Sequence, residues 1–263
     1  MTTEIESISY CISTNGQQMQ KTLKQIRSIS ETMKDVDTEF EVIVAGVIDD
    51  FAALHGELNL VAAHQVALDG RLGKLRNIAA ANTRSEIIVF VDDDIIFPVD
   101  WMSGLIRFSK GNSWDILGNR ILLPDGTRYW DRATASPHRM VHYDHPADDP
   151  LLYQCGCFWV MRRAVFDREK WDESIKFYSE KEEGTNEDVE YSKRLTDRGY
   201  VLKFDKDNYV WHWDDRYSAW YTDIEGLRCI RKEEITRDFG VDHFPDVRPE
   251  FTALLEHFDT CGR

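Results

Sequence analysis

Short apolar runs and helically spaced apolar positions alternate along the first half of the chain. The runs predict strands at residues 8–14, 40–44, 58–63 and 86–91, and the spacing predicts helices at 19–33 and 72–81. Because these strands are apolar on both faces and are separated by helices, they indicate a parallel sheet that is covered by helices on each side.

The second half of the chain has a less regular pattern. We expect a helix at 101–110 and then strands at 116–123 and 127–130, which flank a Pro124-Asp125-Gly126 turn and form a hairpin. Residues 131–150 are rich in His, Pro and Asp and are predicted to form a long loop. The pattern then predicts an apolar stretch at 151–161 and a helix at 186–198. Two strands follow at 201–204 and 209–213, and the final segment, 226–263, is predicted to be helix and tail.

Length and composition favour one domain. The chain has 263 residues, and no repeat, low-complexity tract or linker divides it. We therefore predict a single α/β domain at residues 1–225, built on a mixed, mostly parallel sheet flanked by helices. The segment 226–263 is expected to pack on this domain as a helical tail.

Charge and apolar content exclude several classes of protein. Hydrophobic residues make up 42% of the chain, which is enough for a core, and 32 basic against 47 acidic residues give a net charge of −15, which disfavours nucleic acid as a partner. The first eight residues do not resemble a signal peptide, and no apolar run approaches the ~20 residues that span a bilayer. Five scattered cysteines disfavour disulfides and a structural zinc site. We expect a cytoplasmic protein without a transmembrane segment.

The strongest chemical signal is the run Asp92-Asp93-Asp94, directly after the predicted strand 86–91. Ligands of open α/β sheets bind beyond the carboxyl ends of the strands. Three neighbouring carboxylates repel one another unless a cation neutralises them, and side chains two residues apart in an extended backbone point the same way. Asp92 and Asp94 are therefore candidates to share a Mg²⁺ or Mn²⁺ ion, with phosphate oxygens as its remaining ligands. A solvated acidic loop is the alternative interpretation.

Three segments, in order, resemble GT-A glycosyltransferases, particularly family 2. Residues 70–97 (GRLGKLRNIAAANTRSEIIVFVDDDIIF) match the donor-binding half, in which an Arg-Asn helix and an apolar strand precede a D-x-D motif. Residues 184–190 (GTNEDVE) resemble the acidic Glu-Asp motif at the start of a helix, and Val210-Trp211-His212 resembles a late metal-binding histidine. The resemblance covers roughly residues 8–215. It implies a Rossmann-like GT-A domain with a nucleotide-sugar-binding half at 1–120 and an acceptor-binding half at 121–225.

The resemblance implies a role for each matching residue around the donor. Asp92, Asp94 and His212 would bind Mn²⁺ or Mg²⁺, and Asp92 and Asp93 would contact the nucleotide. His212 could instead be an ordinary core or surface histidine.

Three further residues are candidates for donor binding. Asp50, or its neighbour Asp49, follows the second strand, where such enzymes often place an acidic residue on the base. Lys74 and Arg76 could reach the nucleotide or its phosphates, or could lie on a solvated helix face.

The Glu-Asp motif implies the catalytic machinery. Asp188 would be the general base that takes the proton of the attacking hydroxyl, and Glu187 would bind acceptor hydroxyls. Helix capping is the alternative, because Thr185 or Asn186 followed by acidic residues is also typical of a helix start.

The implied function is a metal-dependent, inverting glycosyltransferase that moves a sugar from a nucleoside-diphosphate sugar (a UDP- or GDP-sugar) to a hydroxyl of a carbohydrate or other acceptor. A divalent cation would stabilise the departing phosphate as a Lewis acid. The alternatives are a retaining glycosyltransferase and a catalytically silent domain that binds a nucleotide sugar or a glycan.

Overall fold

The structure is a computed structural model, and it describes residues 5–54, 58–136, 138–176, 186–213, 220–222, 229–231 and 246–260. Its centre is an eight-stranded sheet with the order β3-β2-β1-β4-β10-β6-β11-β5. The bounds of these strands, in chain order, are β1 Ser7–Thr14, β2 Glu39–Gly46, β3 Asn59–Ala62, β4 Ile87–Asp92, β5 Ile95–Ile96, β6 Ile116–Leu122, β10 Phe158–Arg162 and β11 Leu202–His212.

The sheet is mixed and mostly parallel, as the sequence predicts. Strands β3, β2, β1 and β4 pair in parallel, and so do β6 and β11. Strand β10 is antiparallel to both of its neighbours, and β5 is antiparallel to β11. The central strands β1 and β4 are buried on both faces, which explains why β4 reads as a continuous apolar run.

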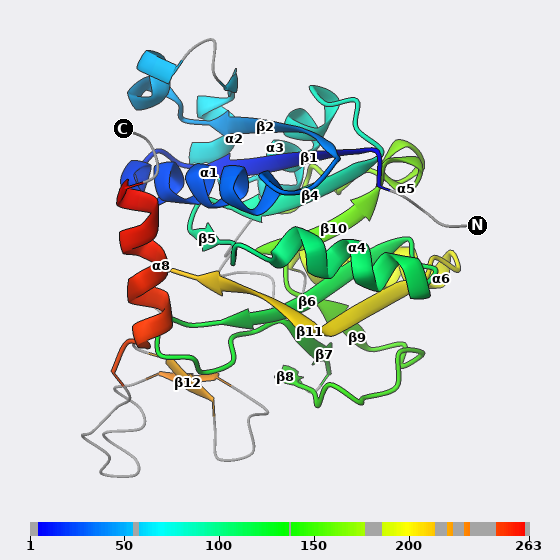
Figure 1. Ribbon diagram of the computed structural model, residues 1–263. Helices are drawn as coiled ribbons and strands as arrows, with labels where there is room; N and C mark the ends of the chain where they lie inside the picture. The colour runs from blue at the N-terminus through cyan, green and yellow to red at the C-terminus, as the bar shows by residue number, and fades with distance from the viewer. Residues whose placement is uncertain are drawn as a thin grey trace.

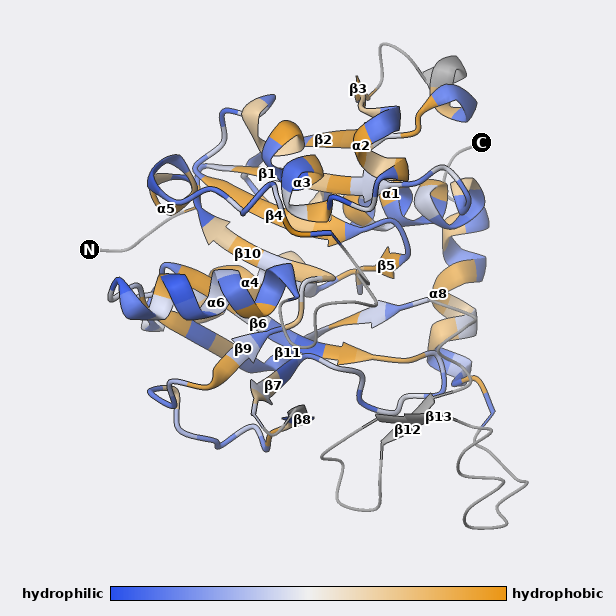
Figure 2. Cartoon of the chain, turned by 180° about the vertical axis from the view of Figure 1, so that it is seen from behind, coloured by the Kyte–Doolittle hydropathy of each residue, from blue (hydrophilic) through white to orange (hydrophobic). Residues whose placement is uncertain are grey.

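Helices cover both faces of the sheet, as Figures 1 and 2 show. Helices α1 (Met19–Met33) and α4 (Trp101–Gly111) share one apolar core with the sheet. Helices α3 (Leu72–Ala81), α5 (Arg163–Arg168) and α6 (Glu187–Asp197) share the other. The remaining short elements of the first half are the 3₁₀ helix η1 (Asp49–Leu54) and helix α2 (His64–Leu68).

Helix α1 buries a polar stripe that holds the segment after β4. Gln25 Nε2 donates to the Asp92 carbonyl at 2.8 Å, and the Thr22 hydroxyl donates to the Asp93 carbonyl at 3.2 Å. Ser28 Oγ accepts from Phe97 N at 3.1 Å, and Thr32 Oγ1 accepts from Met102 N at 3.0 Å at the start of α4. These bonds tie the backbone at the end of β4 and in the segment after it to α1, so α1 fixes the position of the acidic turn.

The second half differs from its prediction in three places. The segment 131–150 is not wholly a loop, because β7 (Arg132–Ala135), β8 (His138–Met140) and β9 (Leu152–Gln154) form a small antiparallel sheet. The turn at 124–126 forms, but 127–130 is no strand and pairs only through a bridge between Leu122 and Arg128. The two strands predicted at 201–204 and 209–213 are one continuous strand, β11, whose register against β6 shifts between Asp205 and Tyr209.

A C-terminal helix, α8 (Pro249–Thr260), lies across the carboxyl end of β11 and beside α1, and is red in Figure 1. Phe251 packs on Trp211 and Trp213, whose ring centroids lie 5.2 and 6.0 Å away. Lys24 and Arg27 of α1 bond to this helix as well. Strands β12 (Trp220–Thr222) and β13 (Cys229–Arg231) form a separate pair, and the rest of 214–245 lies outside the described residues.

Two further sequence expectations can be compared with the described residues. The three cysteines with described side chains, Cys11, Cys155 and Cys157, are buried free thiols. None of the described helices has the length and apolarity that crossing a bilayer requires.

Candidate active site

The three consecutive aspartates at the end of β4 face three different partners. Asp93 Oδ2 accepts a 2.6 Å hydrogen bond from Thr14 Oγ1 at the end of β1. Asp94 faces His212 of β11, and Asp92 faces Arg76 of α3. The strand ends of β1, β4 and β11 thereby meet around this turn, at the sheet edge where α/β proteins bind ligands.

Asp94 and His212 form a buried pair of potential metal ligands. His212 Nε2 lies 3.3 Å from Asp94 Oδ1, each side chain is 4% exposed, and the Tyr129 ring stacks on the imidazole at 4.5 Å. Asp94 Oδ1 accepts no hydrogen bond from the described residues, which suits an oxygen that binds a cation. The described residues contain no group of three or more His, Cys, Asp or Glu side chains placed to hold a metal. The pair therefore fits a divalent ion whose remaining ligands come from outside this pair.

Burial and mutual repulsion raise the pKa values of the other two aspartates. Asp92 has a pKa of about 6, because burial and the negative charge of Asp94 outweigh the attraction of Arg76 and His212. Burial and Asp94 raise the pKa of Asp93 to about 7, against the hydrogen bond from Thr14. The turn thus concentrates negative charge in a poorly solvated place, which favours the binding of a cation.

Arg76 lies beneath this turn and connects it to α6. Its Nη1 donates to Glu187 Oε1 at 2.9 Å, and its Nη2 donates to the Gly156 carbonyl at 2.8 Å and lies 3.5 Å from Asp92 Oδ1. The residue is 1% exposed, so the solvated-face alternative is wrong for Arg76. Burial alone would lower the pKa of its guanidinium, but Glu187 and Asp92 raise it.

The acidic pair Glu187 and Asp188 begins α6, and both residues are buried. Asp188 Oδ2 accepts from Gly156 N at 3.0 Å, and Oδ1 accepts from Val189 N at 2.8 Å. Burial and the charge of Glu187 raise the pKa of Asp188 to about 7. A carboxylate with such a pKa is suited to accept a proton near neutral pH.

Asn186 caps the start of α6 with its backbone only. Asn186 occupies the N-cap position and its carbonyl accepts from Glu190 N at 3.1 Å, but its side chain makes no capping bond. Thr185, the other candidate, lies outside the described residues.

Gly156 joins the two acidic motifs, and its role was not predicted from the sequence. It donates to Asp188 and accepts from Arg76 through one residue's backbone. A Cβ atom at this position would lie 3.1 Å from Glu187 Oε1 and 3.2 Å from Arg76 Nη2. Only glycine leaves room for these groups to converge without displacement, and a Gly between two cysteines in an apolar stretch carries no signal of this kind.

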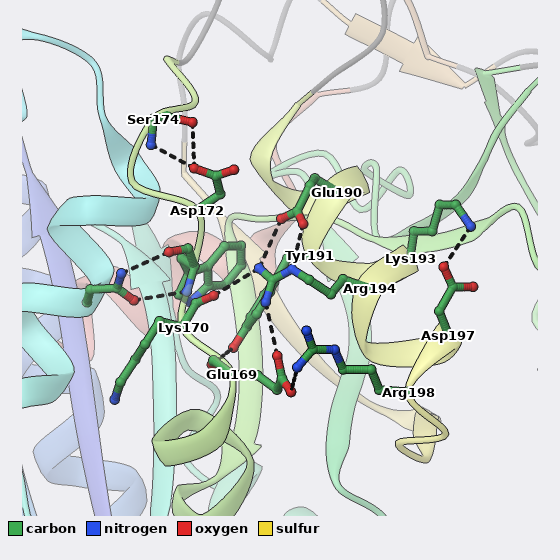
Figure 3. Close-up of polar contacts among 12 residues, drawn as sticks. Glu169, Lys170, Asp172, Ser174, Glu190, Tyr191, Lys193, Arg194, Asp197 and Arg198 are labelled. Carbon is green, nitrogen blue, oxygen red and sulfur yellow. Dashed lines mark hydrogen bonds and ion pairs between the residues drawn. The ribbon is translucent and has the colours of Figure 1, made fainter.

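The segment after α5 supports the site from below. Trp171 stacks under Arg76, with the guanidinium carbon 4.6 Å from the ring centroid. Asn77 binds both backbone groups of Trp171, at 3.0 Å each. On the other side Arg194 of α6 donates to Glu169 and to the Lys170 carbonyl, and Arg198 also pairs with Glu169 (Figure 3). The segment is therefore held to both α3 and α6.

The remaining donor candidates lie on the surface. Asp50 is exposed in η1, and its neighbour Asp49 pairs with His64 Nε2 at 2.8 Å. Lys74 is half-exposed on α3 and lies 3.9 Å from Glu173 Oε2. These residues contact neither the acidic turn nor the Glu187–Asp188 pair by any hydrogen bond or ion pair within the described part of the chain.

Known proteins resemble this chain in sequence over one segment and in fold over most of its length. The family model described as Glycosyl transferase family 2 matches residues 63–169, which include α3 and the acidic turn. No curated protein matches the sequence. Among solved structures, S. aureus TarS 1-349 is similar, with a TM-score of 0.55 and 16% identity over 80% of this chain. Its complex with UDP gives a TM-score of 0.55 and 17% identity over 79% of this chain.

The complex of TarS 1-349 with UDP-GlcNAc gives a TM-score of 0.53 at 15% identity over 80% of this chain. The present chain spans only 59–60% of the length of these TarS fragments and 37% of a longer TarS structure. At such identities the structures show a shared fold, and the family match adds the sequence evidence. The chain accordingly has a GT-A-like fold, and its residues 63–169 match the glycosyl transferase family 2 model, as its sequence motifs implied.

Proposed function

We propose that this protein transfers a sugar from a nucleoside-diphosphate sugar to an acceptor hydroxyl, with the help of a divalent cation and with inversion at the anomeric carbon. The observation that carries the proposal is the convergence of two distant acidic motifs on Gly156. Asp188 binds its N–H, and Arg76, which binds its carbonyl, also contacts Asp92 and Glu187.

The donor would bind at the carboxyl ends of β1, β2 and β4. Asp92, half-buried at the edge of the turn, would contact the ribose or the metal, and Asp93 would hold the turn against Thr14 beside the nucleotide. Asp50 and Lys74 would contact the outer part of the nucleotide, and Arg76 would act on the donor through Asp92. The TarS complexes with UDP and UDP-GlcNAc make a UDP-sugar the first donor to test.

Asp94 and His212 would hold the divalent cation, together with Asp92 and the diphosphate oxygens. When bound, Mn²⁺ or Mg²⁺ would stabilise the negative charge that develops on the departing diphosphate. The carboxylate and imidazole of the buried pair are ligands that Mn²⁺ accepts, and the carboxylates of the turn also suit Mg²⁺.

Asp188 would take the proton of the acceptor hydroxyl as that oxygen attacks the anomeric carbon. Its two bonds to backbone N–H groups fix the carboxylate, and its raised pKa makes it a stronger base than an exposed aspartate. Glu187, held by Arg76, would orient acceptor hydroxyls beside it.

The proposal is tested with purified protein, Mn²⁺ and a panel of UDP- and GDP-sugars, first by following nucleotide release and then by adding glycan acceptors. Proton NMR of the product reports its anomeric configuration. An inverted product supports Asp188 as the base. A retained configuration would remove Asp188 from that role, and nucleotide binding without any transfer would favour the silent binding domain.

A further inference from the structure

Arg76 is a buried cation that contacts both acidic motifs of the site. We infer that Arg76 is a positioning residue: its guanidinium fixes Glu187 and the Gly156 peptide relative to Asp92, and so aligns the general base with the donor. This inference rests on the proposed function and assigns to Arg76 an indirect role instead of contact with the nucleotide.

The planar geometry of the guanidinium makes this role possible. Nη1 donates to Glu187 Oε1 at 2.9 Å, while Nη2 donates to the Gly156 carbonyl at 2.8 Å and faces Asp92 Oδ1 at 3.5 Å. Because the donors of an arginine are rigidly arranged in one plane, three acceptors that bind them are fixed relative to one another. Asp188 joins the same unit through its bond to Gly156 N.

The guanidinium is itself held in place. Trp171 stacks on it at 4.6 Å, and Asn77, the next residue of α3, binds the backbone N–H and carbonyl of Trp171. The Arg76-Asn77 pair therefore supplies both the charged group and the support for its aromatic neighbour. A lysine could keep the charge, but its ammonium lacks the planar fork and the stacking surface.

Burial argues against a direct contact between Arg76 and the diphosphate. The side chain is 1% exposed, and binding a phosphate would require its Nη groups to leave Glu187 or Gly156. Breaking such a buried network costs more than the new contact would return, since the carboxylate of Glu187 would be left buried without its cation.

The charge of Arg76 also has a measurable electrostatic effect. Burial has the largest effect on the pKa of Asp188 and raises it, and Glu187 raises it as well. Arg76 and the N–H groups of Gly156 and Val189 lower it. Removing the positive charge should therefore raise this pKa further.

The test compares Arg76→Lys and Arg76→Gln with the wild type and with Arg84→Gln, a matched control at an exposed arginine just after α3. Four quantities are measured: kcat, KM for donor and acceptor, the affinity for UDP with Mn²⁺, and the pKa of Asp188. The last comes from ¹³C NMR of aspartate carboxyl carbons in substrate-free protein, with the Asp188 signal assigned from Asp188→Asn.

Positioning predicts that kcat falls roughly 100-fold or more in Arg76→Gln and about 10-fold in Arg76→Lys, while the UDP affinity changes less than about threefold. The pKa of Asp188 should rise in Arg76→Gln, which loses the positive charge, and stay near the wild-type value in Arg76→Lys. Arg84→Gln should match the wild type in all four quantities.

Wild-type kcat in Arg76→Lys, or a tenfold or greater loss of UDP affinity with kcat unchanged, would overturn the inference in favour of a direct donor contact. If Arg76→Gln does not fold, the kcat of Arg76→Lys decides. If the wild type transfers no sugar, the proposed function fails on its own, and an unchanged Asp188 pKa in folded Arg76→Gln then refutes the arrangement inferred here.

Discussion

Asp188 lies at the start of a helix and is also the base that we propose for proton transfer. Each carboxylate oxygen accepts one backbone hydrogen bond, so the group is fixed in space, while burial and Glu187 keep its pKa near 7. Hydrogen bonds from N–H groups stabilise the charged form, and loss of water opposes it. The balance leaves a carboxylate that exchanges its proton near neutral pH.

Replacing the proposed base, Asp188, should abolish turnover. Asp188→Asn keeps the size of the side chain but cannot accept a proton, so we expect kcat to fall by about 10³-fold or more with UDP affinity little changed. Asp197→Asn, at the exposed end of the same helix, is the matched control and should retain full activity. A kcat within tenfold of the wild type would assign the base to another residue.

The raised pKa also predicts how activity and stability depend on pH. Since only the ionised form accepts a proton, kcat/KM should rise with pH up to about 7 and then level off. The folded pKa exceeds the ordinary 3.8, so ionisation opposes folding, and this group's effect on stability worsens as pH rises from about 4 to 7. Asp188→Asn should therefore gain stability relative to the wild type over that window, as measured by urea unfolding at several pH values. A constant difference would contradict the assignment.

At the scale of elements, helices outside the site hold the strand ends that carry its residues. The polar stripe of α1 binds the carbonyls of Asp92 and Asp93, and α8 packs on the end of β11, where His212 lies. The Trp213 N–H donates to the Asp94 carbonyl at 2.8 Å, which links the two strand ends directly. Helix α8 thus supports a potential metal ligand from more than 30 residues further along the chain.

Truncating the central contact of α8 should loosen this support. Phe251 is buried against Trp211 and Trp213, so Phe251→Ala should destabilise the protein by about 3 kcal/mol in urea unfolding. The affinity for Mn²⁺ with UDP should fall as well, because the end of β11 becomes less well ordered. Phe40→Ala, which removes a half-exposed ring, should cost less than about 1 kcal/mol. Equal losses of stability and of Mn²⁺ affinity in Phe251→Ala and Phe40→Ala would show that the packing of α8 does not support the end of β11.

At the scale of the whole molecule, the topology brings together groups from distant parts of the chain. The acidic turn follows β4, the Glu-Asp pair begins α6 after β10, and His212 ends β11. Strand β10 runs antiparallel to β4, and the loop before it carries Gly156 between the two motifs. This arrangement leaves an excess of negative charge at one edge of the sheet, which a metal–nucleotide complex would reduce.

Ligand binding should accordingly stabilise the folded state. UDP with Mn²⁺ at about 100 times its dissociation constant should add about 2.7 kcal/mol, seen as a higher melting temperature that EDTA reverses. Asp94→Asn should lose most of this stabilisation, whereas Asp35→Asn, an exposed control after α1, should keep it. Equal shifts in both variants would show that Asp94 does not bind the metal.

The sequence by itself determined the elements whose signals are local. Apolar periodicity placed α1 and α3 at their observed bounds and β1 and β4 within two residues, because these elements bury one stripe or both faces in a large core. The position of the acidic turn directly after a buried strand singled out that turn, and the resemblance to family 2 glycosyltransferases singled out the Glu-Asp pair and His212. The small sheet of β7, β8 and β9 was missed, since its strands are three or four residues long and are stabilised by pairing with each other.

Only the tertiary structure decided which of the charged residues are buried and what they touch. Lys74 and Arg76 lie two residues apart on α3 and look alike in the sequence, yet one is half-exposed and the other lies beneath the acidic turn. Arg76 is surrounded by carboxylates, the stacking Trp171 and a glycine. These groups come from segments 16 to 111 residues away. The free energy of a buried charge depends on such distant partners, and the periodicity of one helix carries no information about them.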